Sequence, residues 1–204
     1  MTDVLLVDYG AGNLRSLRAA FARIRADARV TADADEAAGA RRLVLPGVGA
    51  AAPAMQALRV RGLDGAVTAA LERGGRLLGI CLGLQLLFER SAEGDAACLG
   101  LLPGRSEEMA WARRLPHMGW NDVEPARDHP ITAGLPAVCY FAHSYAVAPA
   151  EAGVVAATTE LDGRRFASVV ANGRVAGAQF HPEKSGAAGR ALLQAFLAWD
   201  EDAP

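Results

Sequence analysis

Cysteine is scarce in this sequence, with only Cys81, Cys98 and Cys139 among 204 residues. An odd count with no close pair and no metal-ligand spacing argues against a disulfide framework and indicates no metal site or cofactor. Basic runs are also missing, and the net charge of -2 argues against binding to nucleic acid. No apolar segment approaches the roughly 20 residues that cross a bilayer, and no basic stretch precedes the first apolar one. We therefore expect a cytoplasmic protein that does not bind membranes.

What the sequence does contain is a repeated alternation of apolar strands and amphipathic helices. Strands are predicted at residues 4–8, around Val30, and at 42–45, and helices at 14–24 and within 55–73. This order predicts an α/β fold with a mostly parallel central sheet and helices on both faces. After Trp111 the apolar runs shorten, so an additional antiparallel portion is expected in the C-terminal half, before a last helix at 187–199. The 51% hydrophobic composition suffices for a single domain over residues 1–204.

A cysteine lies between two glycines in Gly79-Ile80-Cys81-Leu82-Gly83, directly after an apolar strand. A nucleophile on a sharp strand-to-helix turn needs small neighbours, because bulk at either flank would collide with the strand or the helix. Apolar residues at helical spacing follow, which predicts a helix over residues 82–90 with Cys81 at its start. Backbone N–H groups at a helix start favour a thiolate over a thiol. The pattern indicates a nucleophile elbow.

A histidine and a carboxylate follow a second buried strand, in His181-Pro182-Glu183 after residues 175–180. Side chains two residues apart just beyond a strand can point the same way, and Pro182 stiffens the step between them. His181 could then exchange protons with Cys81, while Glu183 holds the imidazole tautomer and supports its protonated form. Because sites in such sheets lie beyond the carboxyl ends of the strands, the two motifs together predict a Cys-His-Glu triad.

The turn Gly10-Ala11-Gly12-Asn13 also follows a strand and invites comparison with a dinucleotide-binding loop. Arg15 stands where that motif needs its third glycine, and its large side chain prevents the close helix packing that the motif depends on. We therefore interpret this segment as a tight turn in which Asn13 caps the following helix.

The run Gly79-Ile80-Cys81-Leu82-Gly83-Leu84-Gln85, together with His181-Pro182-Glu183, resembles the class I (triad) glutamine amidotransferases. In that family a cysteine attacks the side-chain amide of glutamine. Further blocks are similar to one branch of the family, the glutaminase subunits of imidazole glycerol phosphate synthases from histidine biosynthesis. These blocks are Asp8-Tyr9-Gly10-Ala11-Gly12-Asn13-Leu14-Arg15-Ser16, Pro46-Gly47-Val48-Gly49, Pro116-His117-Met118-Gly119-Trp120-Asn121, Tyr140-Phe141-Ala142-His143-Ser144-Tyr145 and Gln179-Phe180-His181-Pro182-Glu183-Lys184-Ser185. They occur in the family's order and extend almost to the C-terminus.

The resemblance implies that Cys81 attacks L-glutamine to give a thioester and ammonia, and that water then releases L-glutamate. The N–H of Leu82, directly after the nucleophile, is expected to stabilise the oxyanion. In the family the strand that ends at Pro46 supplies the second donor, which here would be Val48 or Gly49. The residues expected to hold the glutamine substrate are Gly47, Gln85, Ser144 and Tyr145. His143 has no carboxylate assigned behind it, so we interpret it as structural.

A partner is expected because ammonia released into water near pH 7 would be almost wholly protonated and a poor nucleophile. The segment 116–121 combines an amphipathic ring, a thioether and polar side chains, which suit an interface, although a core turn fits the same pattern. The resemblance implies a heterodimer with the cyclase subunit, a (β/α)8 barrel that forms imidazole glycerol phosphate and AICAR. The expected contact residues are Asn13, Met118, Trp120, Asn121 and Lys184.

Three alternatives remain open from the sequence. A glutaminase subunit of another biosynthetic pathway would share the triad, although such relatives tend to carry Pro-Gly-Gly where this chain has Pro46-Gly47-Val48. A stand-alone cysteine hydrolase would use the same three side chains, release its product into solvent and need no partner. A non-catalytic binding module is disfavoured, because Cys81, His181 and Glu183 are all present.

Overall fold

The computed structural model describes residues 3–199 of the chain, and its centre is a nine-stranded sheet with the order β2-β1-β3-β4-β13-β12-β11-β8-β9. These strands are β1 (Val4–Val7), β2 (Ala28–Thr31), β3 (Arg42–Gly47), β4 (Arg76–Cys81), β8 (His117–Pro125), β9 (Ala137–His143), β11 (Val155–Leu161), β12 (Arg164–Asn172) and β13 (Val175–Ala178). Pairing is parallel from β2 to β13 and antiparallel from β13 to β9. The predicted α/β fold is confirmed, and its parallel and antiparallel portions form one continuous sheet.

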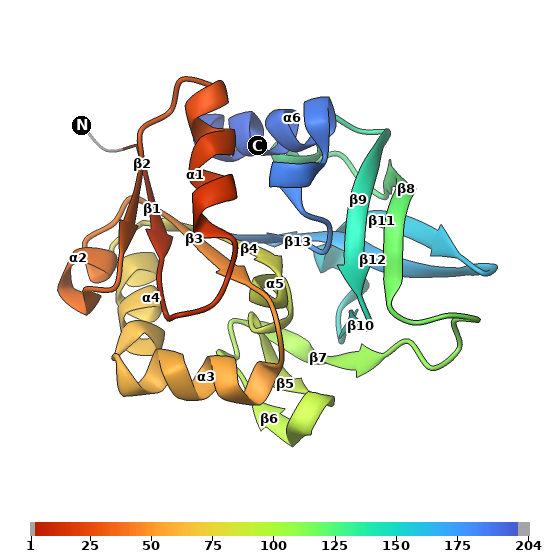
Figure 1. The fold of residues 1–204 in the computed structure, drawn as a ribbon, viewed down its shortest axis with the longest axis horizontal. Helices are drawn as coiled ribbons and strands as arrows, with labels where there is room; N and C mark the ends of the chain where they lie inside the picture. Colours follow the sequence, from red (N-terminus) through yellow and green to blue (C-terminus); the bar gives the residue numbers. More distant parts are fainter. Residues whose placement is uncertain (1–2, 200–204) are drawn as a thin grey trace.

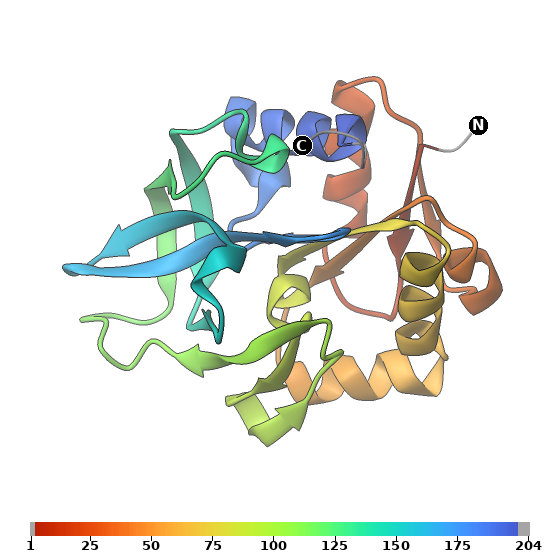
Figure 2. The same cartoon turned by 180° about the vertical axis from the view of Figure 1, so that it is seen from behind.

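Helices cover both faces of the parallel half of the sheet (Figure 1). Helices α1 (Leu14–Arg23) and α6 (Gly186–Ala198) lie on one face, and α3 (Ala51–Val60) and α4 (Leu63–Glu72) lie on the other, as the reverse view in Figure 2 also shows. The short helix α2 (Ala34–Ala38) packs against α4. Residues 55–73 were predicted to hold one or two helices, and two are found, separated at Gly62, whose φ of +67° ends the first helix. No helix within residues 3–199 is long and apolar enough to cross a bilayer.

Side chains alternate between two cores because successive residues of a strand point to opposite faces. In β1, Val4 and Leu6 pack into the core beneath α1 and α6, whereas Leu5 and Val7 pack into the core beneath α3 and α4. A sheet buried on both faces needs continuous apolar strands, which is why these segments are so apolar in the sequence.

A second sheet of four strands, with the order β10-β7-β5-β6, lies on the side of α3 and α4 (Figure 1). Its strands are β5 (Phe88–Ser91), β6 (Ala96–Ala97), β7 (Leu102–Glu108) and β10 (Tyr145–Pro149). The apolar run at residues 138–146 therefore contributes to both sheets, because the chain leaves β9 at His143 and enters β10 at Tyr145. Ser144, between them, lies where the two sheets meet.

Asn13 caps α1 as predicted, since its Oδ1 accepts a hydrogen bond from the N–H of Ser16 at 3.4 Å. The last helix, predicted at residues 187–199, is α6. Two short 3-10 segments, η1 (Glu93–Asp95) and η4 (Pro182–Lys184), contribute residues to the site described below, and a third, η2 (Pro130–Thr132), packs against α6. The fourth, η3 (Ala152–Val154), precedes β11.

Candidate active site

Cys81 ends the fully buried strand β4 with φ +55° and ψ -110°, a backbone conformation that non-glycine residues rarely adopt. The flanking glycines allow the sharp turn. A Cβ on Gly79 would lie 2.6 Å from the carbonyl oxygen of Gly83, and a Cβ on Gly83 would overlap the carbonyl oxygen of Leu45. The sequence pattern therefore has the steric basis that was expected of a nucleophile elbow.

The helix that follows Cys81 is shorter than predicted. Helix α5 spans Leu82–Gln85, and the chain then turns into β5, so the prediction of a helix over residues 82–90 is wrong beyond Gln85. The reason is burial on every side, because Leu86, Leu87 and Phe88 are all fully buried. A surface helix would expose part of such a run, whereas the turn into the second sheet buries all of it.

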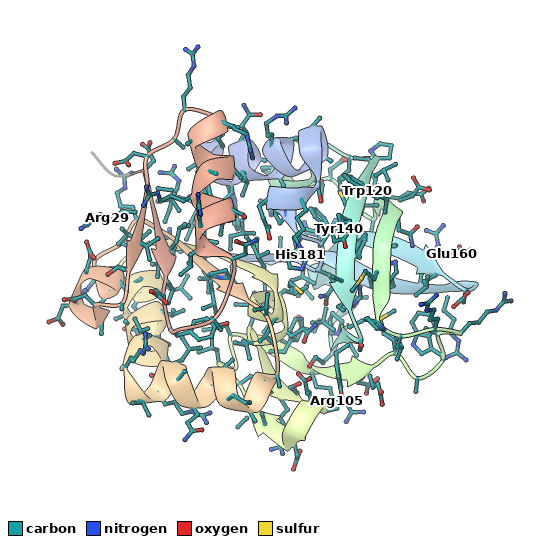
Figure 3. The ribbon with its side chains drawn as sticks, in the orientation of Figure 1. Arg29, Arg105, Trp120, Tyr140, Glu160 and His181 are labelled. Atoms are coloured by element: carbon teal, nitrogen blue, oxygen red, sulfur yellow. The ribbon has the colours of Figure 1, made fainter. Side chains whose placement is uncertain are left out.

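His181 and Glu183 reach Cys81 through the pairing of β13 with β4. These strands are parallel, with Ala178 opposite Ile80, so the residues beyond both strands emerge at the same edge of the sheet. The Nδ1 of His181 lies 3.0 Å from Oε1 of Glu183, and His181 lines the same pocket as Cys81, near enough for the sulfur to raise the pKa of the imidazole. The three side chains that the sequence singled out are thus in contact. Figure 3 shows His181 near the centre of the molecule, between the parallel strands and the pair β8 and β9.

The protonation of His181 reflects two opposing effects. Burial lowers the pKa of His181. Hydrogen bonds to Cys81 and Glu183 and the negative charge of both groups raise it by more, so that the pKa is about 9. The imidazole therefore holds its proton at neutral pH beside the sulfur. A protonated imidazole in contact with a sulfur can serve as a proton donor to a departing group.

Stability should depend on pH through this histidine. His181 has a pKa of about 9 in the folded protein against 6.5 for an unperturbed histidine. Its contribution is thus complete below about 6.5 and is lost as the pH rises through about 9. We expect the melting temperature of the unmodified protein to fall by roughly 5 °C more than that of His181→Asn over this range, measured by differential scanning fluorimetry. Parallel curves for the two proteins would contradict the assignment.

A pocket of about 340 Å³ opens beside Cys81. Most of the residues predicted to form the oxyanion hole or to bind glutamine line this pocket: Val48, Gly49, Leu82, Gln85, Ser144 and Tyr145. Gly47 does not line it. This glycine pairs with Cys81 in the sheet and is packed under α5, where a Cβ would lie 2.8 Å from the N–H nitrogen of Gly83.

The pocket has further lining residues to which the sequence assigned no role in substrate binding, among them Glu93, Pro116 and His143. Glu93 begins η1, and its Oε2 accepts a hydrogen bond of 3.0 Å from the N–H of Ala51 at the start of α3. A signal for this contact existed, because Ala50, which precedes α3, makes no side-chain cap of its own. A helix start without a capping residue requires an acceptor from elsewhere in the chain.

Four of the five residues predicted to face a partner lie on β8 or on η4, which packs against β9. Met118 and Trp120 are 65% and 59% exposed on β8, which is large for apolar side chains. The Trp120 ring packs edge-on against Tyr140 at 5.9 Å, and Figure 3 shows these two side chains. The Lys184 ammonium lies 5.3 Å from the centre of the Tyr140 ring. A core turn was an alternative for residues 116–121, but all of them after Pro116 belong to the nine-residue strand β8.

The other two predicted contact residues have structural partners. The side chain of Asn121 donates to the backbone carbonyl of Glu160 at 2.9 Å. Asn13 is exposed at the start of α1, where it forms the cap described above. Within residues 3–199, no group of three or more histidine, cysteine, aspartate or glutamate side chains is arranged to hold a metal ion.

Comparison with known proteins places this geometry in a family. The family profile described as glutamine amidotransferase class-I matches residues 5–199. The imidazole glycerol phosphate synthase subunit HisH of Xanthomonas axonopodis pv. citri is 52% identical, and the match covers 97% of this chain and 98% of that protein. The protein of the same name from Xylella fastidiosa is 47% identical, with 98% of this chain and 99% of that protein covered.

The fold agrees with these matches. A solved crystal structure described as a glutamine amidotransferase superposes with a TM-score of 0.76 at 23% identity, covering 95% of this chain and 96% of the other. Identity at this level shows the fold alone, whereas the relatives at about half identity extend over nearly the whole chain. The chain belongs to the class-I glutamine amidotransferases and, within that family, to the HisH subunits of imidazole glycerol phosphate synthase.

Proposed function

We propose that the chain hydrolyses L-glutamine to L-glutamate and ammonia at Cys81, and that a cyclase subunit uses the ammonia to form imidazole glycerol phosphate and AICAR in histidine biosynthesis. The observation that carries this proposal is the contact of Cys81 with the buried His181–Glu183 pair at the mouth of a pocket. The identity of about half to HisH proteins, over nearly the full length of the chain, supports the assignment to histidine biosynthesis. A cytoplasmic location is part of the proposal, since the reaction is biosynthetic.

The chemistry follows from the three side chains. The Cys81 thiolate attacks the amide carbon of glutamine, and the carbonyl electron pair moves onto oxygen. His181 then gives its proton to the nitrogen, the carbon–nitrogen bond breaks, and ammonia leaves a thioester on Cys81. Water attacks the thioester while His181 takes its proton, which releases glutamate and restores the thiolate. Glu183, 3.0 Å from Nδ1, keeps the ring oriented for both halves.

The oxyanion formed in each half needs hydrogen-bond donors already in place. Leu82, the first residue of α5, would supply one through its backbone N–H, and Val48 or Gly49, just after β3, would supply the other. Gly49 has a φ of +88°, and a Cβ there would meet no atom within 4 Å. The peptide therefore has space beside it, which supports a change of orientation during activation.

The pocket also suits a zwitterionic amino acid. Glu93 and Lys184 give its lining one negative and one positive group, which complement the ammonium and carboxylate of free glutamine. Backbone groups of Ser144 and Tyr145 lie between the two sheets and would complete the contacts to the substrate. Gln85 lines the same pocket from α5 and would hold the glutamine side chain.

The partner is proposed to be the (β/α)8 cyclase subunit of a heterodimer, docked over the pocket. Exposed Met118 and Trp120 on β8 and Val138 on β9 form an apolar surface that a partner would cover. Lys184 lines the pocket and lies beside Tyr140, at the border between the site and this surface. A stand-alone hydrolase has no use for such a surface, and the identity to HisH proteins disfavours a glutaminase of another pathway.

Glutamine turnover with and without the cyclase subunit tests this proposal. We expect the nucleotide-loaded cyclase subunit to raise the rate at least about tenfold, because ammonia production without a consumer would be wasteful and docking would complete the site. The rate is followed by coupled detection of glutamate. Equal rates with and without the cyclase subunit would contradict the coupling.

Docking over the pocket can be followed in the same samples. Lys184 is the chain's one lysine, so its reaction with acetic anhydride reports on this position by peptide mass spectrometry. Addition of the cyclase subunit should slow acetylation of Lys184. Unchanged acetylation at a saturating concentration would place the partner elsewhere.

A further inference from the structure

One polar side chain beneath the site has no role in the chemistry above. Gln179 follows β13, two residues before His181, and has no exposed surface. Its Nε2 lies 3.7 Å from the sulfur of Cys81, and its Oε1 lies 3.2 Å from Nε2 of Gln85. A buried amide must satisfy both of its ends, and here one end faces the nucleophile.

A backbone carbonyl fixes the direction of these hydrogen bonds. The Nε2 of Gln85 lies 3.0 Å from the carbonyl oxygen of Tyr145, which can only accept. The amide of Gln85 must therefore present its NH₂ group to Tyr145, and the same group donates its second hydrogen to Oε1 of Gln179. It follows that Gln179 presents its own NH₂ group, and not its oxygen, to Cys81.

The Tyr145 carbonyl is itself held in place from its other side. Nδ1 of His143 lies 2.8 Å from this oxygen and must donate to it, so Nε2 of His143 is left as an acceptor. Nδ1 of His117 lies 3.1 Å from that Nε2 and donates to it. Both imidazoles are buried, and burial lowers the pKa of each, which keeps the neutral forms that this arrangement needs. The Tyr145 carbonyl thus accepts hydrogen bonds from both Gln85 and His143, and a rotation of the Gln85 amide would break the first of them.

The sulfur needs such a donor. The carbonyl oxygen of Ala142 lies 3.9 Å from Sγ of Cys81, close enough to accept from a thiol but unfavourable beside a thiolate. An N–H from Gln179 on another side offsets this effect when the sulfur is charged. A donor on this side of the sulfur, with His181 on another, would also restrict the Cys81 side chain to one orientation.

We propose that Gln179 is a positioning residue that donates a hydrogen bond to the Cys81 thiolate, in an orientation set through Gln85 by the Tyr145 carbonyl. The inference rests on the proposed function for its catalytic consequence, but the hydrogen bond itself does not depend on the substrate. Gln179 touches neither the pocket nor the reacting amide, so its effect reaches the reaction only through the sulfur and Gln85.

Alkylation of Cys81 by iodoacetamide tests the hydrogen bond directly. Gln179→Met keeps the length of the side chain and removes its donor, so the midpoint of the alkylation rate against pH should move up by about one unit. Peptide mass spectrometry separates Cys81 from Cys98 and Cys139. For glutamine hydrolysis in the complex, kcat should fall about tenfold while KM changes less than about twofold.

Ser168→Ala is the matched control. Ser168 is fully buried, its backbone carbonyl accepts from the N–H of Gln179, and its hydroxyl has no hydrogen-bond partner among the described residues. This variant should alkylate and turn over like the unmodified protein. If Gln179→Met does not fold, as judged by circular dichroism, Gln179→Asn serves instead, because it keeps an amide but withdraws the donor from the sulfur.

Three results would overturn the inference. The first is an unchanged alkylation midpoint in a folded Gln179 variant, and the second is an equal shift in Ser168→Ala. The third is a rise in KM with kcat unchanged, which would mean that Gln179 acts on substrate binding through Gln85. Absence of glutaminase activity in the complex would refute the proposed function. The alkylation comparison would still show whether Gln179 donates a hydrogen bond to Cys81.

Discussion

Cys81→Ala should abolish glutamine-dependent formation of imidazole glycerol phosphate, with a loss of at least about 10³-fold, while ammonia-dependent formation by the complex remains. The reason is that only the amide-cleaving step needs the sulfur, whereas added ammonia bypasses it. Alanine keeps the Cβ that the turn at φ +55° already accommodates, so the fold should not change. Product formation is measured with the cyclase subunit present, with glutamine or with an ammonium salt at alkaline pH.

The other two cysteines supply controls for this substitution. Burial raises the pKa of the Cys98 thiol to about 11 and that of Cys139 to about 12, and neither lies in the pocket. Cys98→Ala and Cys139→Ala should keep glutamine-dependent activity within about twofold, apart from any loss of stability. If Cys81→Ala lost the ammonia-dependent reaction as well, Cys81 would have a role in the complex other than as nucleophile.

The central part of the site could be predicted because local sterics and sheet geometry decide it. Glycines on both sides of Cys81 are needed for any residue that ends a buried strand at a positive φ, and this requirement is visible in the sequence. His181 and Glu183 follow a second buried strand, and parallel pairing brings the ends of two such strands together. The adjacency of β4 and β13 was the one contact across the sheet that this prediction had to assume.

The parts that the sequence did not reveal depend on contacts distant in the chain. The helix prediction for residues 82–90 failed because apolar spacing cannot distinguish a helix from a run that two neighbouring sheets bury completely. Strand β8 was not predicted because most of its residues are exposed or half-buried and few of them are apolar. Gln179 stood in a recognised motif, but its role rests on amide orientation, which only the Tyr145 carbonyl determines.

Gly83→Ala should have the largest effect among substitutions that leave every reacting group in place. A Cβ at this position would overlap the carbonyl oxygen of Leu45 in β3, and backbone on both sides leaves no side chain to move away. We expect a loss of about 3 kcal/mol in the free energy of unfolding and a fall of about 100-fold in glutamine turnover, because α5 and the N–H of Leu82 must shift.

The matched control for that substitution is Gly65→Ala, which adds the same methyl group on the exposed side of the first turn of α4, where nothing lies within 4 Å of the new atom. Alanine is the better helix former, so this variant should be more stable by about 0.5–1 kcal/mol and fully active. Urea unfolding gives the two free energies, and turnover in the complex gives the activities. If steric overlap is the cause, Gly83→Ala must lose both stability and turnover, whereas Gly65→Ala must lose neither. A Gly83→Ala protein as stable and as active as Gly65→Ala would show that the turn at Cys81 tolerates bulk, and that the glycine after the nucleophile is not what holds the thiolate at the end of β4.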